Sequence, residues 1–246
     1  MRLPHFFALL LAPAVAGVIV DPRPSLGGER DDADAVLERY VQAVGGKTAI
    51  EAVQTRVTQY EVSLGPGING TIELLQQRPD RVVERGVIKG FMGWSAQVSR
   101  GFNGTTAWDQ GPEQPLRLLQ GEELGQYVLT NRLDRDVHLK ELYPARRSLA
   151  DRPVDGKLFR AVEMTSTSGQ KEVWYVDPAT ALLVRIESST KGVVRVLGDY
   201  REVDGILVPF QVSTGDGKRS LMMRAKSIKH NVPLMTEDFA SPMKHN

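Results

Sequence analysis

Residues 65–70 could hold a nucleotide, because Gly-Pro-Gly-Ile-Asn-Gly matches the glycine-rich phosphate loop of dinucleotide-binding proteins. That loop needs a strand before it, a helix after it and an acidic residue about 20 positions later. Here strand patterns lie on both sides, and Pro66 indicates a turn. We therefore expect a turn at 65–70 and no nucleotide cofactor.

Two serines lie in stretches that match parts of hydrolase motifs. Ser95, in Gly-Trp-Ser-Ala-Gln, lacks the second glycine of a nucleophile elbow, and no helix pattern follows it. The stretch 188–191, Ser-Ser-Thr-Lys, has S-x-x-K spacing but lies at a hairpin turn without the companion motifs. The sequence therefore predicts no catalytic residue and a protein that is not an enzyme.

Asp134, Asp136 and His138 are the types of residue that ligate a hard metal. The four histidines show no helical metal-binding spacing, and the absence of cysteine excludes thiolate metal sites and disulfides. We expect a solvated helix end at 134–138 and no metal. The histidines are scattered along the chain: His5, His138, His230 and His245.

The charge balance bears on possible partners. The 246 residues include 31 Lys and Arg against 30 Asp and Glu, a formal net charge of +1. A protein that binds nucleic acid through its phosphates needs a basic surface, so this balance argues against nucleic acid. Hydrophobic residues make up 41% of the chain, which suits one folded domain.

The first residues have the pattern of a signal peptide. Arg2 precedes an apolar stretch, and the small residues Ala14 and Ala16 precede the expected cleavage point, so we assign 1–16 to the signal. The apolar stretch is shorter than the roughly 20 residues of a spanning helix, so we expect export and no integral membrane segment. A polar, flexible lead-in at 17–32 and a tail at 243–246 flank the expected domain.

Hydrophobic periodicity predicts a few helices among many strands. An apolar stripe at helical spacing predicts a helix over 34–44, which Gly45 and Gly46 end, and a shorter helix follows at 48–53. A third helical stretch covers 118–137. From Asp155 onward turn signals recur every 10 to 13 residues, which is typical of an antiparallel meander.

Alternation along the strands predicts one apolar and one polar face. The positions expected to point inward are Tyr60, Val62, Leu64, Ile72, Leu74, Leu182, Val184, Ile186, Val194, Val196, Tyr200, Ile206, Val208, Phe210, Val212, Leu221, Met223 and Ala225. The positions expected to face water are Gln59, Glu61, Glu73, Arg185, Glu187, Arg195, Asp199, Gln211, Arg224 and Lys226. Such a sheet must close on its own side chains or curl over helices.

Four short stretches carry a resemblance to a known family. They are Gly-Thr-Ile-Glu-Leu-Leu-Gln-Gln-Arg-Pro at 70–79, Gly-Phe-Asn-Gly-Thr-Thr-Ala-Trp at 101–108, Tyr-Arg-Glu-Val-Asp-Gly-Ile-Leu-Val-Pro-Phe at 200–210 and Asp-Phe-Ala-Ser-Pro at 238–242. Over 33–242 the chain resembles the periplasmic carriers that sort lipoproteins to the outer membrane, the LolA-like half-barrel superfamily. It departs from them at Gln77, where a basic residue is usual, and by extra length at 85–94.

The resemblance implies a fold that is mainly β with a few α-helices, an incomplete, half-open antiparallel β-barrel of about 11 strands capped by helices. It also implies an apolar cavity for acyl chains and an inward Arg78 that hydrogen-bonds the helical lid and holds the empty cavity closed. Leu124, Tyr127 and Val128 are the lid candidates. The alternative for the inward rows is a fully packed core without a ligand.

The sequence thus predicts a periplasmic carrier without a cofactor, which binds acyl chains of lipids or lipoproteins and exchanges them with membrane-bound donor and acceptor proteins. Two alternatives remain: a half-barrel sensor or scaffold that binds an envelope protein, and an exported hydrolase of unknown type. The expected ligand-binding residues are Arg78, Tyr60, Val62, Ile72, Leu74, Val184, Ile186, Val196, Val208, Phe210, Leu221 and Met223.

Overall fold

A computed structural model describes residues 32–242 except 113, 190–191 and 218–219. The predicted signal peptide at 1–16, all but the last residue of the predicted lead-in at 17–32, and the tail at 243–246 lie outside the described residues. Within the described ranges, no helix is both long and apolar enough to cross a bilayer.

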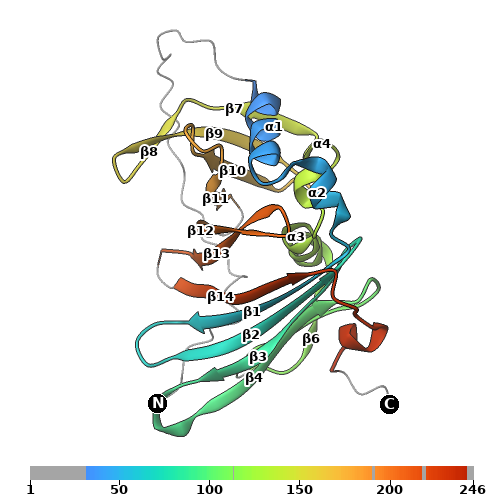
Figure 1. Ribbon diagram of the computed structural model, residues 1–246. Helices are drawn as coiled ribbons and strands as arrows, with labels where there is room; N and C mark the ends of the chain where they lie inside the picture. The colour runs from blue at the N-terminus through green and yellow to red at the C-terminus, as the bar shows by residue number, and fades with distance from the viewer. Residues whose placement is uncertain (1–31, 113, 190–191, 218–219, 243–246) are drawn as a thin grey trace.

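The described strands form one antiparallel sheet of 14 strands, in the order β6-β5-β4-β3-β2-β1-β14-β13-β12-β11-β10-β9-β7, with β8 paired to β9 (Figure 1). The order has two ends, β6 and β7, so the sheet is an open half-barrel and the predicted fold class is confirmed. The strands are β1 (Thr55–Ser63), β2 (Asn69–Gln77), β3 (Arg81–Lys89), β4 (Ser95–Phe102), β5 (Ala107–Gln110), β6 (Arg117–Leu118), β7 (Ala145–Ser148), β8 (Arg152–Val154), β9 (Lys157–Thr165), β10 (Lys171–Val176), β11 (Leu183–Ser188), β12 (Val194–Val203), β13 (Ile206–Gly215) and β14 (Ser220–His230).

The resemblance implied about 11 strands, and the structure has 14 among the described residues. The strands at the two ends of the sheet are short: β5 and β7 have 4 residues, β8 has 3 and β6 has 2. Segments of this length are too short for alternation to be visible in the sequence. Residues 65–68 lie in the turn from β1 to β2, as expected, whereas Asn69 and Gly70 begin β2.

All three predicted helical segments contain helices. The prediction at 118–137 was too long, because β6, α3 and η3 divide that stretch. Gly45 ends the first helix at φ 128°, where a Cβ atom would lie 2.6 Å from the carbonyl oxygen of Gly205 in the β12–β13 turn. The helices are α1 (Ala33–Ala43), α2 (Gly46–Ala52), α3 (Gly121–Asn131), α4 (Leu139–Leu142), η2 (Phe91–Gly93), η3 (Arg135–Val137) and η4 (Thr236–Phe239).

Helices α1 to α4 lie along one side of the curved sheet (Figure 1). Residues of α1, α2 and α4 pack against β9 to β13 in an apolar cluster that we call the helix-covered core. Its centre is Trp174, fully buried, with the ring of Tyr40 edge-on at 5.9 Å and that of Tyr143 at 6.3 Å. This packing attaches the N-terminal helices to the second half of the sheet.

Two further apolar clusters lie on the same, concave face. Under α3, Tyr127 packs with Val82, Ala107 and Leu119, and we call this group the α3 cluster. The other has no residue from α1 to α4, and we call it the open cluster. Its members come from β1 to β4, β14 and the adjoining turns: Tyr60, Val62, Leu64, Ile68, Ile72, Ile88, Trp94, Val98, Leu221 and Met223.

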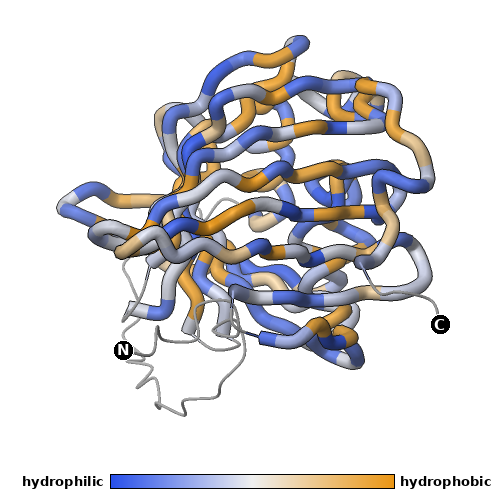
Figure 2. Tube along the Cα trace, turned by 90° about the horizontal axis from the view of Figure 1, so that it is seen from below, coloured by the Kyte–Doolittle hydropathy of each residue, from blue (hydrophilic) through white to orange (hydrophobic). Residues whose placement is uncertain are grey.

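The convex face is not uniformly polar, which corrects the sequence-based expectation. Hydrophobic and hydrophilic positions alternate along the strands (Figure 2). However, Leu75, Val83 and Trp108 form a convex cluster that Phe239 of η4 covers. The C-terminal segment therefore closes an apolar patch on the outside of the half-barrel.

The inward and outward positions of β12 were predicted wrongly. Arg195, expected in water, faces the interior, where its Nη2 donates to Thr130 Oγ1 of α3 at 3.0 Å. Val196, expected inside, is 43% exposed, and Val194 pairs with Glu187, which was expected on the polar face. Asp199 in this strand has a positive φ of 51°. The regular alternation assumed from Tyr200 backward therefore fails at Asp199.

We expect Phe239→Ala to lower the free energy of unfolding by about 3–5 kcal/mol, because it opens a cavity over the convex cluster. Met235→Ala is the matched control, since Met235 belongs to the same segment and is 72% exposed. Urea denaturation of both variants measures the difference. Equal stabilities would contradict the proposed closing role of η4.

Candidate functional site

Arg78 joins the end of β2 to the helical side of the molecule. Its backbone N–H donates to Gln54 O at 3.0 Å, so the chain position is held beside the start of β1. Its guanidinium donates through Nη1 to Glu51 O of α2 at 2.7 Å and through Nη2 to Asp134 Oδ2, between α3 and η3, at 3.0 Å. We call this set of contacts the Arg78 clamp.

Asp134 is the acidic centre of the clamp. Its side chain is 5% exposed and also accepts from Arg132, and His138 Nε2 lies 3.5 Å away. Burial by itself raises the pKa of Asp134, but hydrogen bonds from Arg132 and Arg78 outweigh it and lower the pKa below the ordinary value. The prediction of a solvated helix end was wrong here, because the segment turns its carboxylate toward two arginines.

A second polar group lies beside Trp174. Glu172 is buried and accepts from Trp174 Nε1 at 2.8 Å and from Tyr143 Oη at 3.1 Å. Burial raises the pKa of Glu172, but the guanidinium groups of Arg135 and Arg195 more than offset this, so its pKa lies below the ordinary value. An ionised carboxylate therefore lies within the helix-covered core.

A third polar group lies under α3. The guanidinium of Arg100 stacks over the ring of Tyr127 at 4.5 Å, and Tyr127 Oη donates to Arg100 O at 3.2 Å. Burial raises the pKa of the neighbouring Glu84, although Arg100 opposes the shift. The charge of Arg195 also acts to lower the pKa of Glu84, although four strands separate β3 from β12 in the sheet order. The curl of the sheet thus brings the two side chains within electrostatic reach of each other across the interior.

The structure brings part of the predicted ligand-binding set together. Tyr60, Val62, Ile72, Leu221 and Met223 belong to the open cluster, with Val62 and Ile72 buried and the other three partly exposed. Ile68 of the β1–β2 turn and Trp94 extend this cluster beyond the prediction. Trp94 was missed because it follows a 3-10 turn, where strand alternation does not apply.

The remaining predicted residues lie elsewhere. Leu74 and the lid candidates Leu124 and Tyr127 belong to the α3 cluster, while Val128 is partly exposed outside it. Ile186 and Val208 are buried in the helix-covered core, with Phe210 packed against it. Val184 is the unpaired residue of a β-bulge between β10 and β11 and belongs to none of the clusters, and Val196 points outward.

In the part of the chain that the structure describes, no arrangement of side chains indicates a metal site. No group of three or more His, Asp or Glu side chains there could hold an ion. Asp134, Asp136 and His138 do not converge: Tyr40 Oη donates to Asp136 at 2.7 Å, while Asp134 faces Arg78.

Comparison with known proteins finds no matching family model and no matching curated protein. Solved structures match the fold over most of their length. A DUF1329 family protein from Desulfovibrio piger is 13% identical, with a TM-score of 0.54, and the match covers 85% of this chain and 97% of that one. A putative outer membrane lipoprotein-sorting protein domain from Vibrio parahaemolyticus is 14% identical, with a TM-score of 0.51 and coverage of 82% and 97%.

A LolA superfamily protein from Nitrosomonas europaea is 13% identical, with a TM-score of 0.51, and the match covers 85% of this chain and 98% of that one. Identities this low establish the fold alone. The chain has the LolA-like half-barrel fold, and the resemblance drawn from its short motifs is confirmed at the level of fold.

Asp134→Asn should lower the free energy of unfolding at pH 7 by roughly 2–4 kcal/mol, because two arginines lose their ionised partner. The folded pKa of Asp134 is depressed, so its stabilisation is complete above the unfolded value of about 3.9 and is lost as the pH falls through the folded pKa. Urea unfolding should therefore show that wild type and variant converge in acid.

Glu141→Gln is the control for this experiment, since Glu141 lies near the same histidine but is 70% exposed. It should change stability by less than about 0.5 kcal/mol at pH 7. A constant gap between wild type and Asp134→Asn down to about pH 2.5 would rule out the assigned ionisation.

Proposed function

We propose that this chain is a non-catalytic periplasmic carrier, which binds acyl chains of lipids or lipoproteins in a hollow between the concave face and the helices. In this proposal it receives them from a membrane-bound donor and delivers them to an acceptor at the outer membrane. The structure from Vibrio parahaemolyticus that shares the fold is described as a putative outer membrane lipoprotein-sorting protein domain, and the signal-like residues 1–16 support export.

The observation that carries the proposal is the exposure of groups deep inside the fold. Burial is the largest cause of the pKa shifts of Arg56, Tyr60, Glu84 and Arg195, so protein surrounds each of them. Each nevertheless keeps partial solvent exposure. Groups that the protein surrounds but that water still reaches fit a space open to solvent, so we infer a hollow between the two halves of the curved sheet.

The lining of this hollow suits a hydrocarbon chain at one end. The open cluster presents Tyr60, Leu221 and Met223 with part of their apolar surface uncovered. Each methylene group that moves from water into such a surface contributes roughly 0.8 kcal/mol, so a long acyl chain offers about 10 kcal/mol before the costs of ordering. The unbranched side chain of Met223 adapts to different chains.

The Arg78 clamp supports reversible binding. Its guanidinium joins the sheet to α2 and to the segment after α3 through two polar contacts, so the helices separate from β2 only if these contacts break. Occupancy by a ligand that needs this space would compete with the clamp. Two states of similar free energy, closed and occupied, are what a carrier needs in order to release its cargo.

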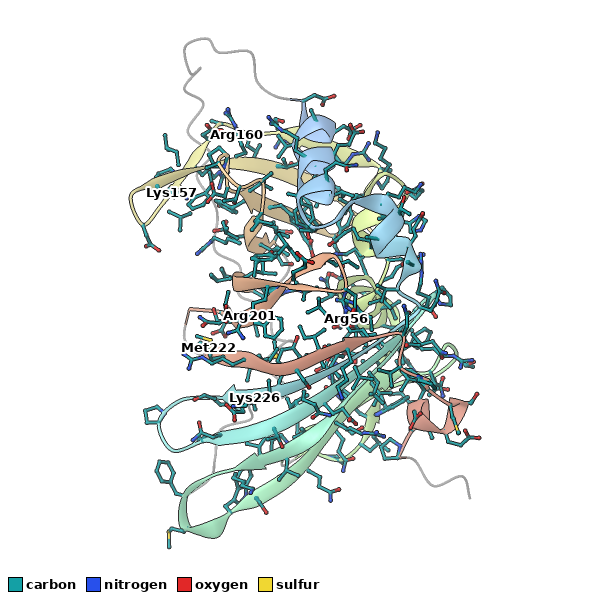
Figure 3. All side chains as sticks on the ribbon, viewed as in Figure 1. Arg56, Lys157, Arg160, Arg201, Met222 and Lys226 are labelled. Carbon is teal, nitrogen blue, oxygen red and sulfur yellow. The ribbon has the colours of Figure 1, made fainter. Side chains whose placement is uncertain are left out.

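The test of the hollow uses two adjacent methionines on β14. Met223 pairs with Val62 and faces the open cluster, whereas Met222 pairs with Ser63 and faces the other side of the sheet (Figure 3). Met223→Asp should weaken binding of an apolar fluorescent probe by at least about tenfold, because it places a carboxylate in the apolar lining.

Met222→Asp should leave probe binding within about twofold of wild type, and circular dichroism checks that both variants are folded. Two folded variants that bind the probe equally well would refute the assignment of the open cluster as the binding surface. A wild-type protein that takes up neither probe nor fatty acid would refute the carrier function itself.

Arg78→Leu should speed exchange of a bound probe by about tenfold or more, because the helical side loses two hydrogen bonds to the sheet. Asp134 keeps Arg132 as a partner, so the fold should persist. Arg85→Leu is the control, since Arg85 is an exposed arginine of the same sheet region that pairs with Glu73. Stopped-flow displacement measures the rates, and equal rates in the two variants would remove Arg78 from the mechanism.

A further inference from the structure

Arg195 has an unusual environment for an enclosed cation. A guanidinium has five N–H donors, and within the described residues the hydrogen-bond acceptor of Arg195 is the hydroxyl oxygen of Thr130, 3.0 Å from Nη2. No carboxylate of the described chain forms an ion pair with it at 4.0 Å or less. Glu172 is the carboxylate that most strongly raises the pKa of Arg195, but Tyr143 and Trp174 already donate to that carboxylate.

Arg56 repeats this pattern on β1 (Figure 3). Its Nε donates to His230 Nε2 at 3.0 Å, and burial lowers the pKa of His230 to about 4, so this partner is uncharged at neutral pH. Burial raises the pKa of Glu84, which favours its protonated form. Arg56 and Arg195 are therefore two enclosed cations whose hydrogen-bond partners are neutral, and Arg195 acts on Glu84, a carboxyl group whose pKa is raised.

Arg195 also lies beside the apolar lining. It pairs with Thr214 on β13, which pairs with Leu221 of the open cluster on β14. Adjacent strands are 4.7–4.9 Å apart, so Arg195 lies about 10 Å from that cluster along one row of the concave face. On its other side it pairs with Ile186 of the helix-covered core.

We propose that Arg195 binds the anionic head group, a carboxylate or phosphate, of an amphiphile whose hydrocarbon tail lies along the open cluster. This inference rests on the proposed function and specifies its ligand class. A charge-assisted hydrogen bond in an enclosed site is stronger than a neutral one, so the head group would set both orientation and selectivity.

The experiment compares ligands with the same tail and different heads, on the chain from residue 17 onward at pH 8. Oleate and methyl oleate compete for a bound fluorescent probe, and inorganic phosphate and acetate test whether a free anion is sufficient. We expect oleate to bind at least about tenfold more tightly than its methyl ester, and phosphate and acetate at 10-fold excess over oleate to displace nothing.

Arg195→Gln should bring the affinity for oleate to within about twofold of that for the ester and leave ester binding unchanged. Arg195→Lys should restore part of the preference, and Arg224→Gln, at an exposed position on β14, should retain all of it. Equal wild-type affinities for acid and ester, or a preference that survives Arg195→Gln, would overturn the inference while leaving the carrier function intact.

Strong competition by free phosphate would show that Arg195 binds a soluble anion, and it would overturn the proposal that the ligand is an amphiphile. Failure of every amphiphile to bind would refute the proposed function and this inference with it. The comparison of acid with ester in wild type needs no variant, so a misfolded Arg195→Gln does not prevent a decision.

Discussion

The constraint on which this structure depends is the cost of enclosing charge. Curling of the sheet over α1 to α4 places Arg56, Glu84, Glu172 and Arg195 inside the fold. An enclosed ionised group needs hydrogen-bond partners, water or a counter-ion. The helices provide many of the partners: Thr130 for Arg195, and Glu51 together with the segment after α3 for Arg78. The positions of the helices therefore decide which enclosed charges of the sheet have hydrogen-bond partners.

The concave face consequently differs from a purely apolar wall. The open cluster lies at one end without helical cover, and the helix-covered core and α3 cluster enclose polar groups at the other. Such a division suits a molecule that is itself divided into a tail and a head. The Arg78 clamp lies at the helical end, so a change in the position of the helices would alter the surroundings of the charges before it affected the apolar lining.

Most of the fold was predictable because its signals are local. The stripe of Val36, Leu37 and Tyr40 and the glycines after it predicted α1, and turn pairs such as Asp204-Gly205 predicted the meander. The site was predictable only where alternation is regular, as for Tyr60 and Val62 on β1. The prediction from alternation failed at Val184, which occupies a bulge. It also failed at Val196 and Arg195, which lie in the same strand as Asp199 with its positive φ.

The sequence by itself thus determined the element types and the inward side of the regular strands, since these depend on neighbours a few residues apart, and its short motifs indicated the half-barrel class by resemblance. Only the tertiary structure decided that Asp134 meets Arg78, that Glu84 and Arg195 approach across four intervening strands, and that Phe239 covers an apolar patch on the convex face. These contacts join residues far apart in the chain. Their geometry follows from the curvature and local irregularities of the sheet, which residue periodicity does not encode.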